Sequence, residues 1–293
     1  MRDGTPSRTA QFVAAARGMG RLLPEAARIA DDPYGMAFSS STLARLVNRS
    51  HDGSRAESIA RIPGLRMWII YMQVRTRVID DAVRAFVAGG GRQLVLLGAG
   101  YDCRALRLPE LATSDVFEID HPATQGHKRE VLERLGARSS AHYLAWDFET
   151  HPMDDLPAAL ADAGHDPHAP TLTIWEGVTM YLTEGAIDAS LRAIATWSPP
   201  RSQLVMTYQE ETRERPSFAK RAVRAVVQRL GEPFKFGWYP EQLPEYLEVR
   251  GFELASDVAM IDAARDLLPR ELAAQVGDTD SRIAIAHCTA HLS

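Results

Sequence analysis

Cysteine is scarce in this chain of 293 residues: Cys103 and Cys288 are the only two, and they lie far apart. Two thiols at that separation form neither a metal-ligand spacing nor a disulfide framework, so we expect both to be reduced and no metal to be bound. Blocks of lysine and arginine are also absent, and the formal net charge is -5. Because the phosphates of a nucleic acid demand a basic face, the sequence argues against that partner.

Long apolar runs are missing as well. The N-terminal segment MRDGTPSRTAQFVAAARGM has an early acid, Asp3, and no apolar stretch of the kind that a secretion signal needs. No later segment approaches the roughly 20 apolar residues of a membrane-spanning helix. Internal repeats and low-complexity tracts are absent too. We therefore expect a cytoplasmic globular protein without membrane contact, built as one large α/β domain or two small ones.

One apolar run ends on a glycine-rich turn. Residues 94–97 are typical of a buried parallel strand, and Gly98, Ala99 and Gly100 follow directly. Without Cβ atoms such a turn lets a ligand approach the backbone, and the amides at the start of the next helix attract polar or anionic groups. We therefore expect a ligand at this turn, with a tight turn that binds nothing as the alternative.

The third glycine of the dinucleotide fingerprint is also missing, because Cys103 occupies its position. This weakens the case for a nicotinamide cofactor. The next predicted strand, 116–120, nevertheless ends in Asp120, at the distance where an acid would hold the hydroxyl pair of a ribose. The combination suggests an adenosine ligand without a pyrophosphate, which points to S-adenosylmethionine.

Strand and helix patterns alternate after the triple glycine at 89–91. Further strands are predicted at 142–146, 171–175, 203–208, 252–260 and 282–291, and helices at 123–135, 154–163, after Thr183, and at 240–250. This rhythm predicts an α/β fold with a doubly wound, mostly parallel sheet of seven strands. The alternating last segment suits an antiparallel strand. Such a sheet is the Rossmann-like architecture of class I methyltransferases.

A helical part precedes this sheet. Residues 1–88 contain no convincing strand, and we interpret them as an N-terminal helical cap on a core formed by residues 89–293. The last helix of the cap, at about 65–87, places Arg75 in an apolar row. A cation there needs either a buried ion-pair partner or a ligand, and both roles stay open.

An insertion is predicted after the fifth strand, at about 209–240. Residues 216–230 form a basic amphipathic pattern, which we interpret as a helical lid beside the crevice. A helix that binds a membrane or a partner is the alternative. Aromatic residues that would contact the substrate or pack in the core follow at Phe234, Phe236, Trp238 and Tyr239.

Three predicted strands are followed by an acid at their carboxyl ends: Asp120, Asp147 and Glu176. The carboxyl ends of parallel strands open into one crevice, so these acids should converge on Gly98 although they are far apart in the sequence. Glu176 and Gly177 come directly after the run TLTIW, where a buried carboxylate needs a cationic or hydrogen-bonding partner. An ion pair with Arg75 would meet that need and is compatible with a ligand contact.

The other two acids each have a competing structural role. Asp120 could cap the following helix, but His121 occupies the cap position ahead of Pro122 and leaves Asp120 free to hold a ribose. Asp147 precedes Phe148, and this pair could bind an adenine amino group and stack on its ring. An aspartate that opens a loop is equally suited to turning the chain, so both roles stay open.

Five stretches together match the motifs of one family: RTRVIDD at 75–81, LLGAGYDCRALRL at 96–108, VFEIDHP at 116–122, AWDF at 145–148 and WEGVTMYL at 175–182. On these stretches the chain resembles the leucine carboxyl methyltransferase family. That family includes protein phosphatase methyltransferases and bacterial relatives that methylate polyketide carboxylates or hydroxyls. The resemblance covers most of the chain and is clear from about 56 to 208.

The resemblance implies how the crevice residues divide the cofactor S-adenosylmethionine between them: its methionine part goes to Arg75 and Gly98, the amino group to Glu176, the ribose to Asp120, and the adenine to Asp147 with Phe148. The predicted cofactor-binding set is completed by Ala99, Gly100, His121 and Gly177. Cys103 stands where the family often has threonine, and we expect it to be a tolerated small residue.

The methyl acceptor is inferred from chemistry and from an absence. Methyl transfer is a direct displacement, so a carboxylate, already a nucleophile, needs only to be held in line. A hydroxyl needs a general base, for which His121, Tyr181 and Tyr208 are candidates by position. Because no crevice motif pairs a histidine with an orienting acid, we expect O-methylation of a carboxylate on a small apolar or aromatic molecule of the polyketide kind.

Three other functions stay open. A hydroxyl-directed O-methyltransferase would use one of the candidate bases. A nicotinamide-dependent oxidoreductase is disfavoured by the missing third glycine. A catalytically silent module that only binds adenosylmethionine would be distinguished by an assay alone. The sequence does not indicate the oligomeric state.

Overall fold

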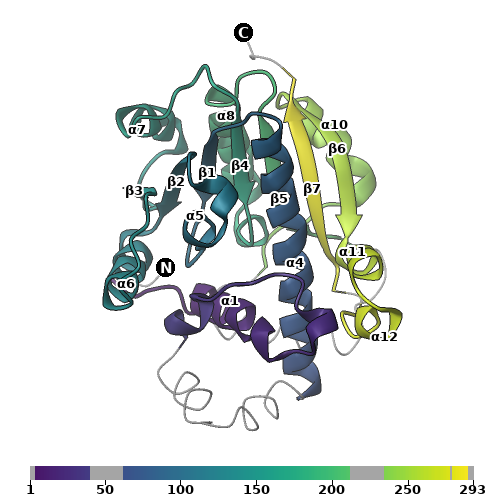
Figure 1. Ribbon diagram of the computed structural model, residues 1–293. Coiled ribbons are helices and arrows are strands. Elements are labelled where there is room, and N and C mark those ends of the chain that lie inside the picture. Colours follow the sequence, from purple (N-terminus) through teal and green to yellow (C-terminus); the bar gives the residue numbers. More distant parts are fainter. Residues whose placement is uncertain (1–3, 40–61, 212–233, 278, 290–293) are drawn as a thin grey trace.

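The computed structural model describes residues 4–39, 62–211, 234–277 and 279–289 (Figure 1). The basic pattern at 216–230 and most of the predicted lid insertion lie outside the described residues. Among the described helices, none is both long enough and apolar enough to cross a membrane. Neither Cys103 nor Cys288 forms a disulfide, and both are buried.

A seven-stranded sheet forms the centre of the molecule, with the strand order β3-β2-β1-β4-β5-β7-β6. Its strands are β1 (Gln93–Leu97), β2 (Asp115–Asp120), β3 (His142–Ala145), β4 (Thr171–Trp175), β5 (Gln203–Gln209), β6 (Phe252–Ala259) and β7 (Ser281–Cys288). The first five pair in parallel, while β7 runs antiparallel between β5 and β6. This confirms the predicted mostly parallel sheet with an antiparallel last strand.

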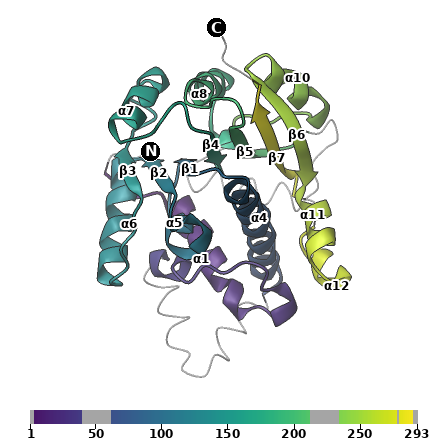
Figure 2. The same cartoon turned by 45° about the horizontal axis from the view of Figure 1, so that its top comes forward.

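Helices cover both faces of the sheet, because successive side chains of a buried strand point to opposite sides. Leu94 and Leu96 pack toward α4 (Pro63–Ala88) and α11 (Met260–Leu267). Val95 and Leu97 pack toward the other face, which is covered by α7 (Leu156–Asp162), α8 (Glu184–Thr196) and α10 (Leu243–Glu248). Figure 2 shows these two helical layers on opposite sides of the strands.

The remaining helices are α1 (Arg8–Gly18), α5 (Arg104–Arg107), α6 (Pro122–Arg134) and α12 (Arg270–Ala273). Short 3-10 turns lie at Met19–Leu22, Glu25–Ala27, Gly35–Phe38, Pro109–Leu111, Met153–Asp155, Thr179–Tyr181 and Pro240–Gln242. The helices predicted at 154–163 and 240–250 each begin as such a turn. In both, the α-helix starts with a proline in its first turn, Pro157 or Pro244, because proline lacks the N–H that later helical positions must donate.

The N-terminal segment packs on α4, which itself packs on the sheet. Phe12 of α1 stacks on Trp68 of α4 with ring centroids 5.8 Å apart. Ala15 and Ala16 share one hydrophobic core with α4 residues such as Met72 and with the sheet. Figure 1 shows α1 lying across α4, near the edge of the sheet where the parallel strands end. The division of the chain at residue 88 stays a prediction.

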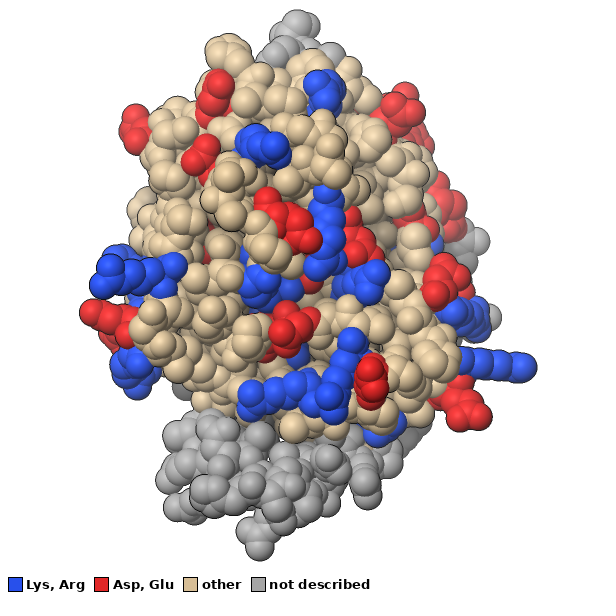
Figure 3. All heavy atoms as spheres, in the orientation of Figure 1, with Lys and Arg blue, Asp and Glu red and all other residues tan. Residues whose placement is uncertain are grey.

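Charged side chains of both signs are interspersed over the face shown in Figure 3. One example lies on the exposed side of α4, where Asp81 accepts from Arg77 at 2.7 Å and pairs with Arg84 at 2.9 Å. Each of these three side chains is about two-fifths exposed, so the pairs add only tenths of a kcal/mol, or up to about 1 kcal/mol, to stability.

Candidate active site

A cavity of about 480 Å³ opens at the carboxyl ends of the parallel strands. Every residue of the predicted cofactor-binding set lines it: Arg75, Gly98, Ala99, Gly100, Asp120, His121, Asp147, Phe148, Glu176 and Gly177. The convergence expected from the parallel strand ends is therefore present in the structure. What the cavity holds is decided by the chemistry of these side chains.

The backbone conformation of the turn requires glycine at two positions. Gly98 and Gly100 have φ angles of 73° and 52°, in the left-handed region that residues with a Cβ atom rarely adopt. A Cβ atom on Gly98 would lie 2.6 Å from Cγ2 of Val178, which is closer than real contacts allow. The turn therefore brings its backbone to the cavity wall with no side chain in the way.

Asp120 is held at the end of β2 by two backbone donors. Its Oδ2 accepts from the amide of Gly100 at 2.5 Å, and its Oδ1 accepts from the amide of His121 at 2.7 Å. Burial raises the pKa of this carboxyl, and the two amides oppose that rise. Each oxygen keeps lone pairs for further donors, so Asp120 can still accept from a hydroxyl pair.

His121 occupies the cap position predicted for it. Its Nδ1 accepts from the amide of Ala123 at 3.2 Å at the start of α6. This bond assigns the ring proton of a neutral imidazole to Nε2, which lies 3.9 Å from Oδ2 of Asp147. In this tautomer the Nδ1 lone pair of His121 is engaged by the amide of Ala123.

Asp147 has the chain-turning role that its position predicted, and it also lines the cavity. Its Oδ1 accepts from the amide of Glu149 at 3.0 Å, which turns the chain after β3. That backbone donor lowers the pKa of the carboxyl, so the side chain is ionised where it lines the cavity. Phe148 lines the cavity beside it while packing partly on the core.

Arg75 and Glu176 form the ion pair predicted for them, with Nη2 and Oε1 2.8 Å apart and less than a tenth of either side chain exposed. Burial alone would raise the pKa of Glu176. The charges of Arg75, Arg104 and Arg17 outweigh burial and hold that pKa well below its usual range. Glu176 is therefore an ionised carboxylate at the wall of the cavity.

Two atoms of this pair are buried without a hydrogen-bond partner among the described residues. They are Oε1 of Glu176 and Nε of Arg75. The 2.8 Å contact of Oε1 with Nη2 of Arg75 is an ion pair without hydrogen-bond geometry, and Nε takes no part in it. Unpartnered buried polar atoms are costly and uncommon. They fit a ligand that brings both a cationic donor and an anionic acceptor to this corner of the cavity.

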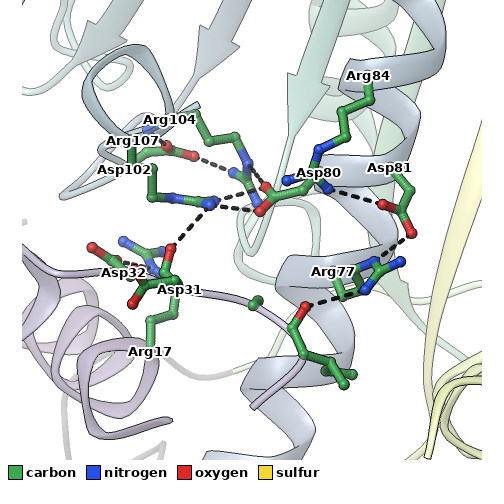
Figure 4. Close-up of polar contacts among 12 residues, drawn as sticks. Arg17, Asp31, Asp32, Arg77, Asp80, Asp81, Arg84, Asp102, Arg104 and Arg107 are labelled. Carbon is green, nitrogen blue, oxygen red and sulfur yellow. Dashed lines mark hydrogen bonds and ion pairs between the residues drawn. The ribbon is translucent and has the colours of Figure 1, made fainter. Parts of the chain in front are cut away.

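The pair belongs to a larger buried cluster of charges, most of which Figure 4 shows. Four arginines face four acids, in the ion pairs Arg17–Asp32, Arg75–Glu176, Arg104 with Asp80, Asp102 and Glu176, and Arg107–Asp80. The formal charges cancel. A zwitterionic ligand group keeps that balance, whereas a single added charge would disturb it in a region of low dielectric.

Several residues of the site gave no usable signal in the sequence. The cavity is also lined by Ser7, Thr9, Ala10, Val13 and Arg17, from α1 and the turn before it. Ser7 caps α1 by accepting from the amide of Ala10 at 3.1 Å, so the Ser-Arg-Thr-Ala stretch could have marked where this helix begins. Nothing local indicates that α1 lies over the cavity, because that placement depends on its packing against α4.

The three candidate bases are not equivalent. His121 and Tyr181 line the cavity, whereas Tyr208 does not. Strand alternation sends Tyr208 to the same core as Met206, where its hydroxyl donates to Oδ2 of Asp257 at 2.8 Å. Burial and the neighbouring acid raise its pKa well above the usual range. The structure therefore places the Tyr208 hydroxyl away from the cavity, beside Asp257.

The aromatic residues after the insertion divide between core and cavity. Trp238 is buried, with its ring 4.9 Å from that of Phe236 and 5.6 Å from that of Tyr208. Phe234 instead packs against Tyr181, with ring centroids 5.7 Å apart, beside the cavity wall. Among these described aromatic side chains, Tyr181 lines the cavity and Phe234 packs against it.

Two solved structures share the fold along nearly the whole chain. One, titled as a "putative methyltransferase" from Thermobifida fusca YX, has a TM-score of 0.59 at 18% identity and covers 99% of this chain and 97% of its own. A DUF574 family protein from Streptomyces avermitilis has a TM-score of 0.57 at 16% identity, over 94% and 97%. The seven-stranded sheet with its antiparallel last strand is the Rossmann-like fold of class I methyltransferases.

Sequence comparison identifies the family. The leucine carboxyl methyltransferase model matches residues 10–195, and the chain belongs to this family. A relative from Mycobacterium sp. (strain JLS), named "Putative S-adenosyl-L-methionine-dependent methyltransferase", is 34% identical across 78% of this chain and 72% of its own length. One of the same name from Mycolicibacterium vanbaalenii is 30% identical across 97% and 93%. The chain is a methyltransferase, and S-adenosylmethionine is its cofactor.

Proposed function

We propose that this methyltransferase transfers the methyl group to a carboxylate oxygen of a small apolar or aromatic acceptor of the polyketide kind, giving a methyl ester. When bound, S-adenosylmethionine supplies an electrophilic methyl group and a zwitterionic methionine end. Arg75 and Glu176 would hold that end, since the unpartnered atoms of this pair match its carboxylate and its ammonium. Asp120 would accept from the ribose, and Asp147 with Phe148 would contact the adenine.

The main support for a carboxylate acceptor is a cation at the cavity wall. Among the described residues, the cations that line the cavity are Arg17, Arg75 and Lys235. Arg17 is 2.9 Å from Asp32, and Arg75 is paired with Glu176. Lys235 is exposed and forms no ion pair with the described residues, while its amide donates to the carbonyl of Met180 at 2.7 Å. An anionic acceptor would find its counter-charge in Lys235 and an aromatic wall in Tyr181 and Phe234.

The placement of the candidate bases supports the same choice. A hydroxyl acceptor must lose its proton during the reaction, and a base has to receive it. Nδ1 of His121 is engaged by the amide of Ala123, and its Nε2 lies 3.9 Å from Oδ2 of Asp147. His121 and Tyr181 both line the cavity and are the candidates for the hydroxyl-directed alternative. A carboxylate needs no base, and holding it in line supplies the rate.

The reaction product tests this proposal. We expect a methyl ester that releases methanol in mild alkali, formed at a rate that changes little from about pH 6.5 to 8.5. The acceptor carboxyl, with a pKa of about 4, is ionised throughout that range. An alkali-stable methyl ether, formed at a rate that climbs with pH and collapses in a His121→Ala or Tyr181→Phe protein, would show a hydroxyl-directed enzyme instead.

Lys235→Met tests the anchoring cation. We expect the KM of a carboxylate acceptor to rise about fivefold, in line with the up to ~1 kcal/mol of a solvent-exposed ion pair. Adenosylhomocysteine affinity, measured by calorimetry, should stay unchanged, and Lys235→Arg should retain the acceptor KM. An acceptor KM that is equal in the Met and wild-type proteins would place the acceptor anion elsewhere.

A further inference from the structure

The buried charges behind Glu176 converge on one side chain, Arg104 of α5, which is 1% exposed. Its Nη1 donates to Oε2 of Glu176 at 2.8 Å and also to Oδ2 of Asp102. Its Nε donates to Oδ1 of Asp80 at 2.7 Å. The three acids come from the end of β4, from the turn after β1 and from α4, so one guanidinium joins three separate parts of the chain. Figure 4 shows two of these acids, Asp80 and Asp102, beside Arg104.

Asp80 holds Arg104 in place from α4. Its two oxygens also accept from Arg107, at 2.5 and 2.7 Å, so the carboxylate is fixed between two arginines. Arg107 in turn reaches the carbonyl of Asp31 at 3.3 Å in the N-terminal segment. Asp80 itself does not line the cavity, so any effect it has on the cavity is transmitted through Arg104.

We propose that Arg104 is a positioning residue for cofactor binding, which holds Oε2 of Glu176 so that Oε1 stays available to the ammonium of the cofactor. The proposal rests on the proposed contact of Glu176 with the methionine end. In addition, Arg104 would keep that contact available before the cofactor arrives.

The physical basis of this positioning is that two arginines, Arg75 and Arg104, compete for the carboxylate of Glu176. A carboxylate facing a single guanidinium prefers the bidentate geometry, in which both oxygens accept parallel hydrogen bonds. Such a pair between Glu176 and Arg75 would turn both carboxylate oxygens toward Arg75. Because Arg104 holds Oε2, Oε1 lies near Arg75 without a hydrogen bond. The site is thereby kept in the geometry that binding needs, and the cost of rearrangement is avoided.

The ionisation of Glu176 gives a second measure of the role of Arg104, separate from cofactor affinity at a single pH. The charged groups that face it are Arg75 from α4, Arg104 from α5, Arg17 from α1 and, nearby, Asp102 from the turn before α5. Removing Arg104 removes one of the cations that oppose burial, so the pKa of Glu176 rises. As pH falls through that raised pKa, Glu176 becomes neutral and cannot pair with an ammonium.

The experiment measures adenosylhomocysteine affinity by calorimetry from pH 8 down to the lowest pH at which thermal melts show every protein folded. For Arg104→Gln we expect affinity about tenfold below wild type at pH 8, and a further loss relative to wild type as pH falls. Arg104→Lys keeps the charge but cannot reach all three acids at once, so we expect a loss of about three- to tenfold with the wild-type pH profile. Asp120 is present in every protein, so its titration is common to all the profiles.

Two further variants make the outcome decisive. Asp81→Asn is the matched control, since Asp81 adjoins Asp80 on α4 but lies on the exposed face, and this protein should bind as wild type does. Glu176→Gln should bind weakly, with the wild-type profile. Wild-type affinity for Glu176→Gln would overturn the proposed cofactor contact itself.

A weak Glu176→Gln protein beside an Arg104→Gln protein of wild-type affinity and profile would overturn the positioning role alone. A weakened Arg104→Gln protein whose pH profile matches wild type would also overturn it, by showing a structural contribution only. Thermal melts establish whether each variant folds. If Arg104→Gln does not fold, Arg104→Lys decides: affinity equal to wild type contradicts the proposal.

Discussion

A protein carrying Glu176→Gln is expected to bind adenosylhomocysteine about a hundredfold more weakly than wild type. The substitution keeps the shape of the side chain but removes the negative charge that would face the cofactor's ammonium. A charge-assisted hydrogen bond contributes about 1.5–3 kcal/mol, and here the loss also leaves Arg75 and Arg104 short of a buried counter-charge. Calorimetric titration measures the effect directly and needs no knowledge of the acceptor.

The companion variant Arg75→Gln distinguishes a coupled pair from two separate contacts. Either single substitution leaves the other charge buried without its partner, at a cost of a few kcal/mol. The double variant removes both charges, so it should lose less affinity than the sum of the single losses. Strict additivity would mean that Arg75 and Glu176 bind the cofactor independently, in spite of their 2.8 Å contact.

Asp120→Ala is expected to lower adenosylhomocysteine affinity by about 10- to 100-fold. A charge-assisted bond to the ribose contributes about 1.5–3 kcal/mol, and Asp120 also holds the amides of Gly100 and His121 at the cavity wall. Burial raises the pKa of Asp120, so wild-type affinity should begin to fall at a less acidic pH than an ordinary aspartate would cause. Circular dichroism confirms folding, and unchanged affinity in a folded variant would refute the ribose contact.

Asp120→Asn separates those two contributions. The amide keeps one oxygen that can accept from the backbone and removes the charge, so its loss should be smaller than that of the alanine variant. It should also abolish the acid-side fall in affinity, because no carboxyl remains to titrate at this position.

Much of the fold followed from local sequence patterns. The run at 94–97, the acid that ends β2 and the cap at His121 are short-range signals. The first six strands were predicted within one residue of their observed ends, while the last was predicted to extend three residues beyond Cys288. The convergence of Gly98, Asp120 and Glu176 also followed, because a parallel sheet brings the carboxyl ends of its strands to one edge. The partner of Arg75 was predictable because a cation in an apolar row leaves few alternatives.

Tertiary structure decided the rest. Local position made Tyr208 a candidate base, but strand alternation turned its side chain into the core. Arg17 and Arg104 were unremarkable in sequence, since nothing near them along the chain shows that α1 lines the cavity or that Arg104 contacts both Asp80 of α4 and Glu176 after β4. Buried ion pairs join segments that are distant in sequence, and hydrophobic packing of those segments sets which charges meet. The sequence by itself therefore determined where a cofactor could bind, while the packing of α1, α4 and α5 on the sheet determined how Glu176 is held there.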